Sequence, residues 1–411
     1  MIEFSVGNYR SFKDVVTFSM VAAPIQHEDG EIDRNNVFTI PRDINLLKSA
    51  AIYGANASGK SNLVRAISFV RNFVLNSAVG RKVKDRIDTE IYKLSKDTEN
   101  EPSYFEIIFE IGTTRYRYGF EVDRRSVKSE WLYQTLSTQE SELFTREEKA
   151  IEVFDNFSEG KELNKKTRDN ALFLSVVAQF NGEIATKIID WFDRTLVVIF
   201  DLEDELEYEG MTDEIMDDDD RRQSLINLVR TLDLGIEDIR IVLTPFEDVD
   251  ETFLHEVKTA HWRYDTDNNK LSIEQFDLNN EESAGTQKLY RLSGLLLNLL
   301  EDGGVLIVDE LDSRLHPLIT GAIVKLFNSP KTNPKNAQLI FTTHDTNLLS
   351  SNLFRKDQIW FTEKNRYGAT DLYSLAEYKI PEQSSFEQDY IAGKYGAVPF
   401  IGDLSRLLGK K

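Results

Sequence analysis

The segment of this chain best suited to chemistry is Gly54-Ala55-Asn56-Ala57-Ser58-Gly59-Lys60-Ser61. Its spacing, a glycine and four residues followed by Gly-Lys-Ser, is the pattern of a phosphate-binding loop, in which backbone N–H groups close around phosphate oxygens. In that arrangement Lys60 reaches the β- and γ-phosphates and the Ser61 hydroxyl ligates Mg²⁺. A glycine-serine turn before an ordinary helix is the alternative interpretation. The loop residues predicted to bind ATP with Mg²⁺ are Gly54, Asn56, Ser58, Gly59, Lys60, Ser61 and Asn62.

Two acidic residues, Asp309 and Glu310, form a second candidate group directly after the apolar run 305–308. Four consecutive apolar residues predict a fully buried parallel strand, and α/β sheets bind ligands at the carboxyl ends of such strands. We predict that Asp309 holds Mg²⁺ through water and that Glu310 activates the attacking water as a general base. The alternative is a core strand that ends in a solvated acidic turn.

A histidine and a serine-glycine segment complete the candidate site. His344 follows the apolar run 339–343. It is either structural or a switch residue that hydrogen-bonds the γ-phosphate and so distinguishes ATP from ADP. The segment 283–287, Ser-Ala-Gly-Thr-Gln, precedes an apolar helix predicted over 289–300. A serine and a glycine at a helix N-terminus can bind an anion, although the same serine can simply cap the helix.

The elements that must position these residues predict an α/β fold with a P-loop core. Residues 49–53 suit a buried strand and residues 62–74 carry apolar side chains at helical spacing, so the loop lies between a strand and a helix. Residues 104–136 alternate with a period of two, which indicates an antiparallel meander inserted into that core. The other elements expected are two strands within 2–20, an irregular stretch at 24–45, helices at 184–192 and 223–234, and short strands within 239–276.

Composition narrows the class of protein. The chain has 411 residues, 41% hydrophobic and 29% charged, which is enough for a large core and several subdomains. No apolar run approaches the roughly 18 residues of a membrane span, and the first residues lack the basic and apolar regions of a signal peptide. The sequence contains no cysteine, which excludes disulfides and thiolate metal sites. We therefore expect a cytoplasmic protein that does not engage a membrane.

The formal net charge is −21, which argues against a broad clamp on DNA because neutralising phosphates needs a basic surface. Nucleic acid is therefore not the favoured partner. Part of the acidic excess lies in 201–220, which is either a solvated segment or a docking site for a basic partner. The small basic cluster 81–86 is expected to be solvated.

The order of these motifs along the chain resembles the heads of ABC-type ATPases, and within them the branch that includes SMC, RecF and OLD proteins. The chain is most similar to bacterial ATP-binding proteins of the RloA and abortive-infection type, which accompany phage-defence and restriction loci. The further segments that carry this resemblance are Asn8-Tyr9-Arg10-Ser11-Phe12, the meander 104–133, Glu310 to Pro317 and Tyr390 to Pro399.

The resemblance implies a shared nucleotide site. Ser283, Gly285 and Gln287 occupy the place of the ABC signature, which departs here from Leu-Ser-Gly-Gly-Gln. In such heads the signature of one subunit contacts the γ-phosphate held by the P-loop of the other. ATP would then join two heads into a dimer, and hydrolysis would release them.

Four more residues receive roles from the same resemblance. Arg10 and Asp312 are predicted to contribute to nucleotide binding. Gln179 is the candidate for the glutamine that senses Mg²⁺, and Gln134 is the alternative. The expected domains are an N-terminal ATPase lobe with the P-loop (1–75), an antiparallel β-subdomain with a return segment (76–180), a helical and acidic insertion (181–240) and a C-terminal ATPase lobe (241–411).

The resulting hypothesis is a switch that hydrolyses ATP slowly, forms a dimer or higher oligomer around ATP, and controls a separate effector, a nuclease or toxin, in bacterial anti-phage defence. The carboxylates after His344 are scattered, whereas two-metal nucleases need them clustered, so the effector is expected on another chain. The alternatives are a RecF-like DNA-binding or repair ATPase and the ATP-binding subunit of a transporter.

Overall fold

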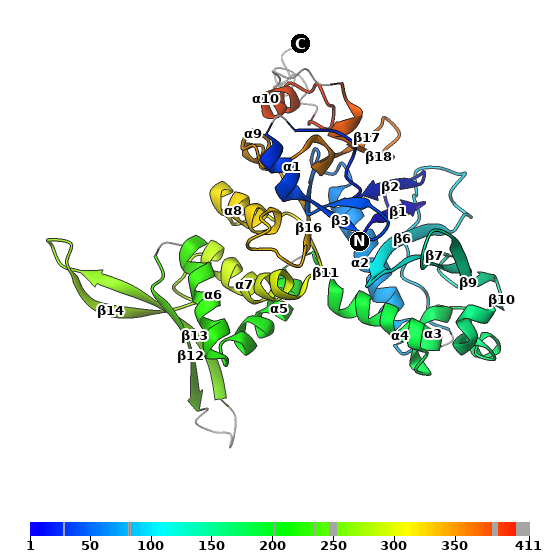
Figure 1. Ribbon diagram of the computed structural model, residues 1–411, viewed down its shortest axis with the longest axis horizontal. Helices are drawn as coiled ribbons and strands as arrows, with labels where there is room; N and C mark the ends of the chain where they lie inside the picture. Colours follow the sequence, from blue (N-terminus) through cyan, green and yellow to red (C-terminus); the bar gives the residue numbers. More distant parts are fainter. Residues whose placement is uncertain are drawn as a thin grey trace, which may run out of the picture.

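The chain folds into two sheets side by side and a projecting arm (Figure 1). The computed structural model describes residues 1–27, 29–80, 82, 84–200, 202–232, 235–245, 253–379 and 385–399. Asp201 and two positions of the basic cluster 81–86 lie outside these residues. In the described part of the chain, no helix is long and apolar enough to cross a membrane.

A six-stranded, mostly parallel sheet forms the core that the sequence predicted. Its first five strands are parallel and only the last, β18, runs antiparallel to its neighbour. The side chains of β5 alternate between two apolar cores, which is why its sequence is a continuous buried run. In spatial order the strands are β11 (Leu196–Ile199), β15 (Val305–Val308), β16 (Gln338–Thr342), β5 (Ser49–Tyr53), β17 (Ile359–Lys364) and β18 (Thr370–Ser374).

The strand β11 corrects the expectation that 181–240 is a helical insertion. The predicted helix is present as α4 (Glu183–Asp190), but a π-helical turn, Trp191–Thr195, follows it and leads directly into the edge strand. All four residues of β11 are buried beside β15. A four-residue apolar run without alternation fits a buried strand and a buried helix segment alike, so the sequence alone did not identify β11.

Helices cover both faces of this sheet. Helix α2 (Lys60–Asn76) lies on one face, and α7 (Ala284–Asp302), α8 (Pro317–Asn328), α9 (Asn347–Ser350) and α10 (Phe386–Ile391) contribute to the core on the other. The stretch 24–45, expected to be irregular, contains α1 (Gly30–Asn36) and a hairpin of β3 (Val37–Ile40) and β4 (Ile44–Leu47). These elements were not predicted because they are short: α1 has seven residues, and β3 and β4 have four each. Short 3-10 helices occupy Asp155–Gly160, Asn164–Lys166, Lys356–Gln358 and Leu375–Glu377.

The predicted meander is part of a seven-stranded antiparallel sheet. The alternation read from the sequence is confirmed, since Phe105, Ile107 and Phe109 are buried on one face. The N-terminal strand β1 pairs with β6, so this sheet draws its strands from both of the expected segments 1–75 and 76–180. In spatial order its strands are β10 (Ala150–Val153), β9 (Glu140–Glu147), β8 (Val127–Thr135), β7 (Thr114–Val122), β6 (Ser103–Ile111), β1 (Glu3–Gly7) and β2 (Val16–Ser19).

Helix α2 joins the two sheets into one body. Phe73 of α2 packs edge-on against Phe120 of β7, with ring centroids 5.5 Å apart, while Ile52, Ile307 and Ile340 of the parallel sheet belong to the same apolar cluster. Helix α3 (Phe173–Gln179) adds to this cluster from beside the C-terminal end of α2.

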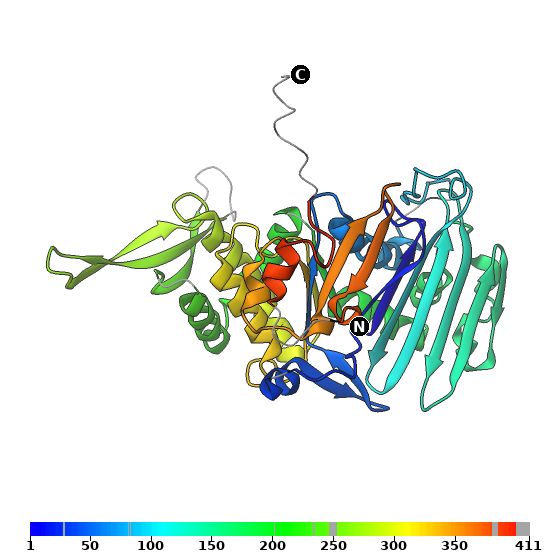
Figure 2. The same cartoon turned by 90° about the horizontal axis from the view of Figure 1, so that it is seen from above.

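The arm consists of a separate three-stranded sheet, β12 (Asp238–Pro245), β13 (Phe253–Tyr264) and β14 (Lys270–Asp277). Both views show it pointing away from the two larger sheets (Figures 1 and 2). Helices α5 (Leu202–Ile215) and α6 (Asp219–Leu232) lie at its base. Asp219 and Asp220 form the first turn of α6, where carboxylates are stabilised by the helix dipole, so part of the acidic stretch has a local structural role.

A buried carboxylate ties the seven-stranded sheet to α3. Glu130 of β8 accepts hydrogen bonds from the backbone N–H groups of Phe173 (2.7 Å) and Leu174 (3.0 Å) and from the Tyr118 hydroxyl (3.0 Å). The guanidinium of Arg146 lies 3.7 Å from the same carboxylate, and both side chains are almost fully buried. The charge is thus compensated by a cation and by the N-terminus of a helix.

We predict that Glu130→Ala lowers the free energy of unfolding by about 3–5 kcal/mol, because it leaves two helical N–H groups without their acceptor and the buried Arg146 guanidinium without its counter-charge. Urea denaturation followed by circular dichroism measures this change. The matched control is Glu142→Ala on β9, whose side chain is exposed and whose loss should change stability by less than about 0.5 kcal/mol. Equal midpoints for the two variants would contradict the assignment.

Candidate nucleotide-binding site

The predicted catalytic and binding residues meet at the carboxyl edge of the parallel sheet. β16 lies between β5 and β15, so the loop after β5, His344 after β16 and the two acids after β15 come together. A cavity of about 290 Å³ is lined by Asn56 to Asn62, Glu310 and His344. Ligands of α/β sheets bind at this edge.

The P-loop is held from behind by residues that lie far away in the sequence. The Thr370 hydroxyl donates to the Ser58 carbonyl at 2.7 Å, and the Ser58 hydroxyl lies 2.6 Å from that of Thr362. Gly59 has φ = 123°, and a Cβ there would lie 2.4 Å from the Thr370 hydroxyl oxygen. A glycine is therefore required at this position for both its backbone conformation and its close contact.

Ser11 of the N-terminal motif completes this support. Its hydroxyl accepts a hydrogen bond from the Asn62 amide at 2.7 Å and lies 2.8 Å from the hydroxyl of Thr370. Its carbonyl also accepts the backbone N–H of Thr370. The structure thus places the motif 8–12 directly against the P-loop helix. Nothing in the local sequence marked Thr362 or Thr370, since their role depends only on tertiary contact.

The loop presents donors that suit phosphate. The first N–H groups of α2 have no partner within the helix and point toward the loop, as at every helix N-terminus. The Lys60 ammonium donates to the carbonyls of Gly54 (2.8 Å) and Ala55 (3.3 Å) at the floor of the loop. Burial lowers the pKa of Lys60, and the nearby carboxylates of Asp309, Glu310 and Asp312 oppose that shift.

The two acids after β15 are fixed by Thr342, a residue that the sequence did not single out. Its hydroxyl donates to an oxygen of Asp309 at 2.5 Å and accepts the backbone N–H of Glu310 at 2.7 Å. Glu310 has φ = 51°, an unusual conformation for a residue with a side chain, and its carboxylate is exposed at the cavity. Strained backbone at such a position is typical of a functional residue.

The loop that follows these acids contacts the loop that carries His344. An Asp312 oxygen accepts the backbone N–H of His344 at 3.3 Å, and the Tyr53 hydroxyl donates to the Asp345 carbonyl at 3.2 Å. Among the described residues, the other oxygen of Asp312 and one of Asp345 are buried without a hydrogen-bond partner. Buried polar atoms of this kind mark sites that a ligand or water completes.

Arg10 lies beside the cavity and not in its lining. Its guanidinium pairs with Glu90 at 2.5 Å, and its backbone N–H donates to the Glu90 carbonyl at 2.7 Å. These residues line a neighbouring cleft of about 470 Å³ together with Arg65, which lies one helical turn beyond Ser61. The cleft follows the exposed side of α2 away from the P-loop.

The assignment of Gln179 as a Mg²⁺ sensor is not supported by its position. Gln179 is exposed at the end of α3, and Ser175 of that helix donates to the Val74 carbonyl at the C-terminal end of α2. At 1.5 Å per residue, Val74 lies about 21 Å along α2 from Lys60. The alternative, Gln134, lies within β8 of the other sheet and does not line the cavity either. Sequence order alone could not reveal that α3 returns to the C-terminal end of α2, far from the P-loop at the other end.

The signature-like residues also lie outside the cavity of their own chain. Ser283 is exposed and caps α7 by accepting the backbone N–H of Thr286 at 3.1 Å. A Cβ at Gly285 would lie 2.7 Å from the Arg314 carbonyl, so this helix begins tightly against the loop after Glu310. The Gln287 amide donates to the carbonyls of Asn279 and Glu282.

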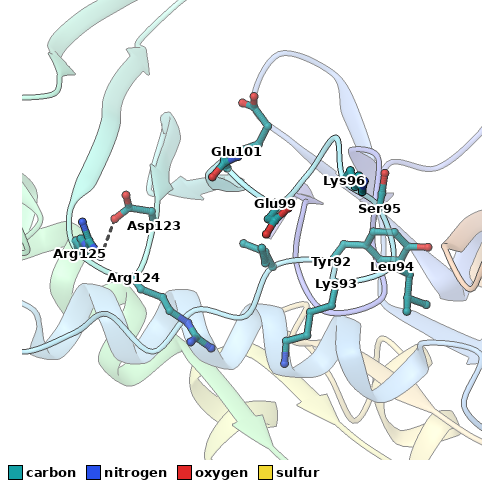
Figure 3. Close-up of a pocket in the computed structure, with 12 residues that line it drawn as sticks. Tyr92, Lys93, Leu94, Ser95, Lys96, Glu99, Glu101, Asp123, Arg124 and Arg125 are labelled. Carbon is teal, nitrogen blue, oxygen red and sulfur yellow. Dashed lines mark hydrogen bonds between the residues drawn. The ribbon is translucent and has the colours of Figure 1, made fainter.

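A larger cavity lies elsewhere on the described residues. It measures about 840 Å³ and opens between the loop 91–101 and the turn 123–125 (Figure 3). Its lining carries side chains of both charges, and an Asp123 carboxylate oxygen accepts the backbone N–H of Arg125 at 2.6 Å. No glycine loop or helix N-terminus faces it, so the smaller P-loop cavity is the better match to phosphate.

Fold and site together define a P-loop protein with an α/β core. The family model described as "AAA domain, putative AbiEii toxin, Type IV TA system" matches residues 49–350, which span more than half of the sequence. The chain therefore belongs to this family of AAA-domain proteins. No curated protein sequence matches it.

Solved structures that resemble this chain include SMC head domains. The SMC head domain from Thermotoga maritima shares 14% identity with a TM-score of 0.44, and the match covers 92% of this chain and 99% of that one. The SMC head domain with a coiled coil and joint from Pyrococcus yayanosii shares 11% identity with a TM-score of 0.44, covering 95% of this chain and 99% of that one.

We predict that Lys60→Ala weakens nucleotide binding on the order of 100-fold, since it removes the buried cation that faces the phosphates. Fluorescence titration with a labelled ATP analogue measures the affinity. Lys149→Ala is the matched control, because that lysine is largely exposed and pairs only with Asp169. Unchanged affinity in Lys60→Ala would place the phosphates elsewhere.

Proposed function

We propose that this protein is a Mg²⁺-dependent ATPase that binds ATP between two copies of the chain and acts as a switch. The observation that carries the proposal is the convergence of the P-loop, Glu310 and His344 on one cavity, with the Asp309 carboxylate near enough to Lys60 to act on its pKa. The Ser61 hydroxyl and the Asp309 carboxylate are oxygen ligands of the kind that Mg²⁺ prefers, so the residues fit the ion. When bound, the ion would neutralise charge on the β- and γ-phosphates.

Within one site, different residues bind the nucleotide, activate water and contact the terminal phosphate. The loop N–H groups and Lys60 bind and orient the triphosphate. Thr342 fixes the backbone of Glu310, whose exposed carboxylate then accepts a proton from the attacking water. His344 lies at the cavity wall, where its imidazole can hydrogen-bond the terminal phosphate. Arg10 would contact the remainder of the nucleotide from the neighbouring cleft.

The second half of the site is proposed to come from another copy. Ser283 and Ala284 are exposed at the N-terminus of a 19-residue helix, and they do not line the P-loop cavity of their own chain. A helix N-terminus attracts anions, so the γ-phosphate of a facing copy is a matched ligand. Because the γ-phosphate would form part of the interface, hydrolysis would remove a contact and separate the copies.

The output of the switch is proposed to be control of a separate effector, a nuclease or toxin, in anti-phage defence. The family description names a toxin and a toxin–antitoxin system, which supports that context. The late carboxylates are used in packing: Glu363 accepts from the Tyr373 hydroxyl, and Asp389 pairs with Lys394. In the part of the chain that the structure describes, no cluster of three His, Asp or Glu side chains could hold a metal. These observations favour an effector on another chain.

We predict that Glu310→Gln slows ATP turnover by about 10²–10⁴-fold while ATP still binds, because only the general base is lost. ATP-bound dimers should then accumulate. Phosphate release and light scattering measure the two effects. Glu301→Gln on α7, where the carboxylate is half-exposed and pairs with Arg221, is the control. A Glu310→Gln variant that stays monomeric with ATP would reject the shared site.

We also predict that an effector encoded beside this gene copurifies with the protein in a nucleotide-dependent manner. Pull-downs with ATP, with ADP and with the Lys60→Ala variant compare the states. Phage protection should be lost in Lys60→Ala together with ATP binding. Protection that persists without ATP binding would reject the switch, whereas binding of duplex DNA that strengthens with ATP and weakens with salt would favour a DNA-maintenance role.

A further inference from the structure

The residue immediately before Ser283 is held by the arm. An oxygen of Glu282 lies 2.6 Å from His261 Nε2 and also bonds the Thr259 hydroxyl; both partners lie on β13. The Glu282 side chain is only 10% exposed, and the His261 ring stacks on Phe276 of β14 at 4.7 Å. A carboxylate this well buried and bonded has one preferred orientation, so the backbone next to Ser283 is fixed by side chains of the arm.

The loop 277–283 is fastened to the arm at its other end as well. Lys258 Nζ lies 3.0 Å from an oxygen of Asp277, and the backbone N–H of Leu278 donates to the Val257 carbonyl at 3.0 Å. On the opposite side, the Gln287 amide donates to the Glu282 carbonyl at 3.1 Å. The loop therefore connects β13 on one side to the first turn of α7 on the other.

Beyond its base, the arm is surrounded by solvent. β14 is exposed along nearly its whole length, with Leu271 at 60% and Ile273 at 48% exposure. The arm sheet has three strands and is not part of either larger sheet (Figure 2). Among the described residues, the base of the arm enters an apolar cluster through Ile239, Val257 and Leu278, which pack against residues of α6 and α7. A tilt of the arm would therefore move the residues of β13 that bond Glu282.

We propose that Glu282, held by His261 and Thr259, is a positioning residue that orients the Ser283 turn toward the facing copy, and that the arm regulates the shared ATP site through it. This inference rests on the proposed function. Glu282 does not touch the nucleotide in its own chain, so it acts on assembly and turnover and leaves the P-loop of the same chain unaffected. The arm then links an exposed structure to the formation of the composite site.

The test separates binding of ATP from completion of the site. In Glu282→Ala and in His261→Ala, ATP turnover should fall on the order of 10-fold to 100-fold, as expected when a catalytic group is misplaced by about 1 Å. ATP-dependent dimerisation should weaken in parallel, while the affinity of the isolated chain for labelled ATP stays unchanged. Glu282→Gln, which keeps an oxygen acceptor for Thr259, should recover part of the turnover.

The matched control is Glu274→Ala on β14, whose exposed carboxylate pairs with Arg263 away from the loop and whose loss should leave turnover and dimerisation unchanged. Wild-type turnover and dimerisation in both Glu282→Ala and His261→Ala would overturn the proposal. Thermal melting shows whether either variant unfolds. If one does, Thr259→Val, which keeps the volume of the side chain, takes its place, and the same loss of turnover and dimerisation is expected. Ser283→Ala tests the shared site separately from the role of Glu282, because normal ATP-dependent dimerisation in that variant would refute the shared site itself.

Discussion

The buried ammonium of Lys60 is the interaction on which the rest of the site depends. It lies on the floor of the P-loop against two backbone carbonyls and faces the carboxylates of Asp309, Glu310 and Asp312. A cation in this position is costly to bury unless anions surround it, and a triphosphate would supply more of them. The strand order suits this requirement, because β16 separates β5 from β15 and leaves room for phosphates between the loop and the acids.

The proposed site consists of two halves, and the Ser283 half does not line the P-loop cavity of its own chain. The P-loop half is supported by Ser11, Thr362 and Thr370, which are all buried. The Ser283 half is supported by the arm and by the loop after Glu310, and its first residues are exposed. This asymmetry suits a site in which one half binds nucleotide stably and the other half engages only when a second copy is present.

Much of the core could be predicted because its signals are local. The glycine loop, the acids after β15 and the buried run of β5 each reveal themselves within ten residues of sequence, and the structure brings them together. Thr342, Thr362 and Thr370 could not be predicted, since a threonine in a strand is ordinary until its neighbour in space is known. Gln179 was misassigned for the same reason: the sequence shows that a glutamine follows α2 and not which end of α2 it approaches. The edge strand β11 was not identified because a short apolar run without alternation fits a buried strand and a buried helix segment alike.

The contact of Thr370 with the P-loop has a consequence for the synthesis of the protein. A nascent chain that has emerged through Ser61 contains the entire glycine motif, yet Thr370, whose hydroxyl bonds the Ser58 carbonyl, is translated about 300 residues later. Stable capture of a nucleotide thus awaits the strands β17 and β18. Prematurely terminated products that lack those strands would carry the glycine motif without its support from Thr370.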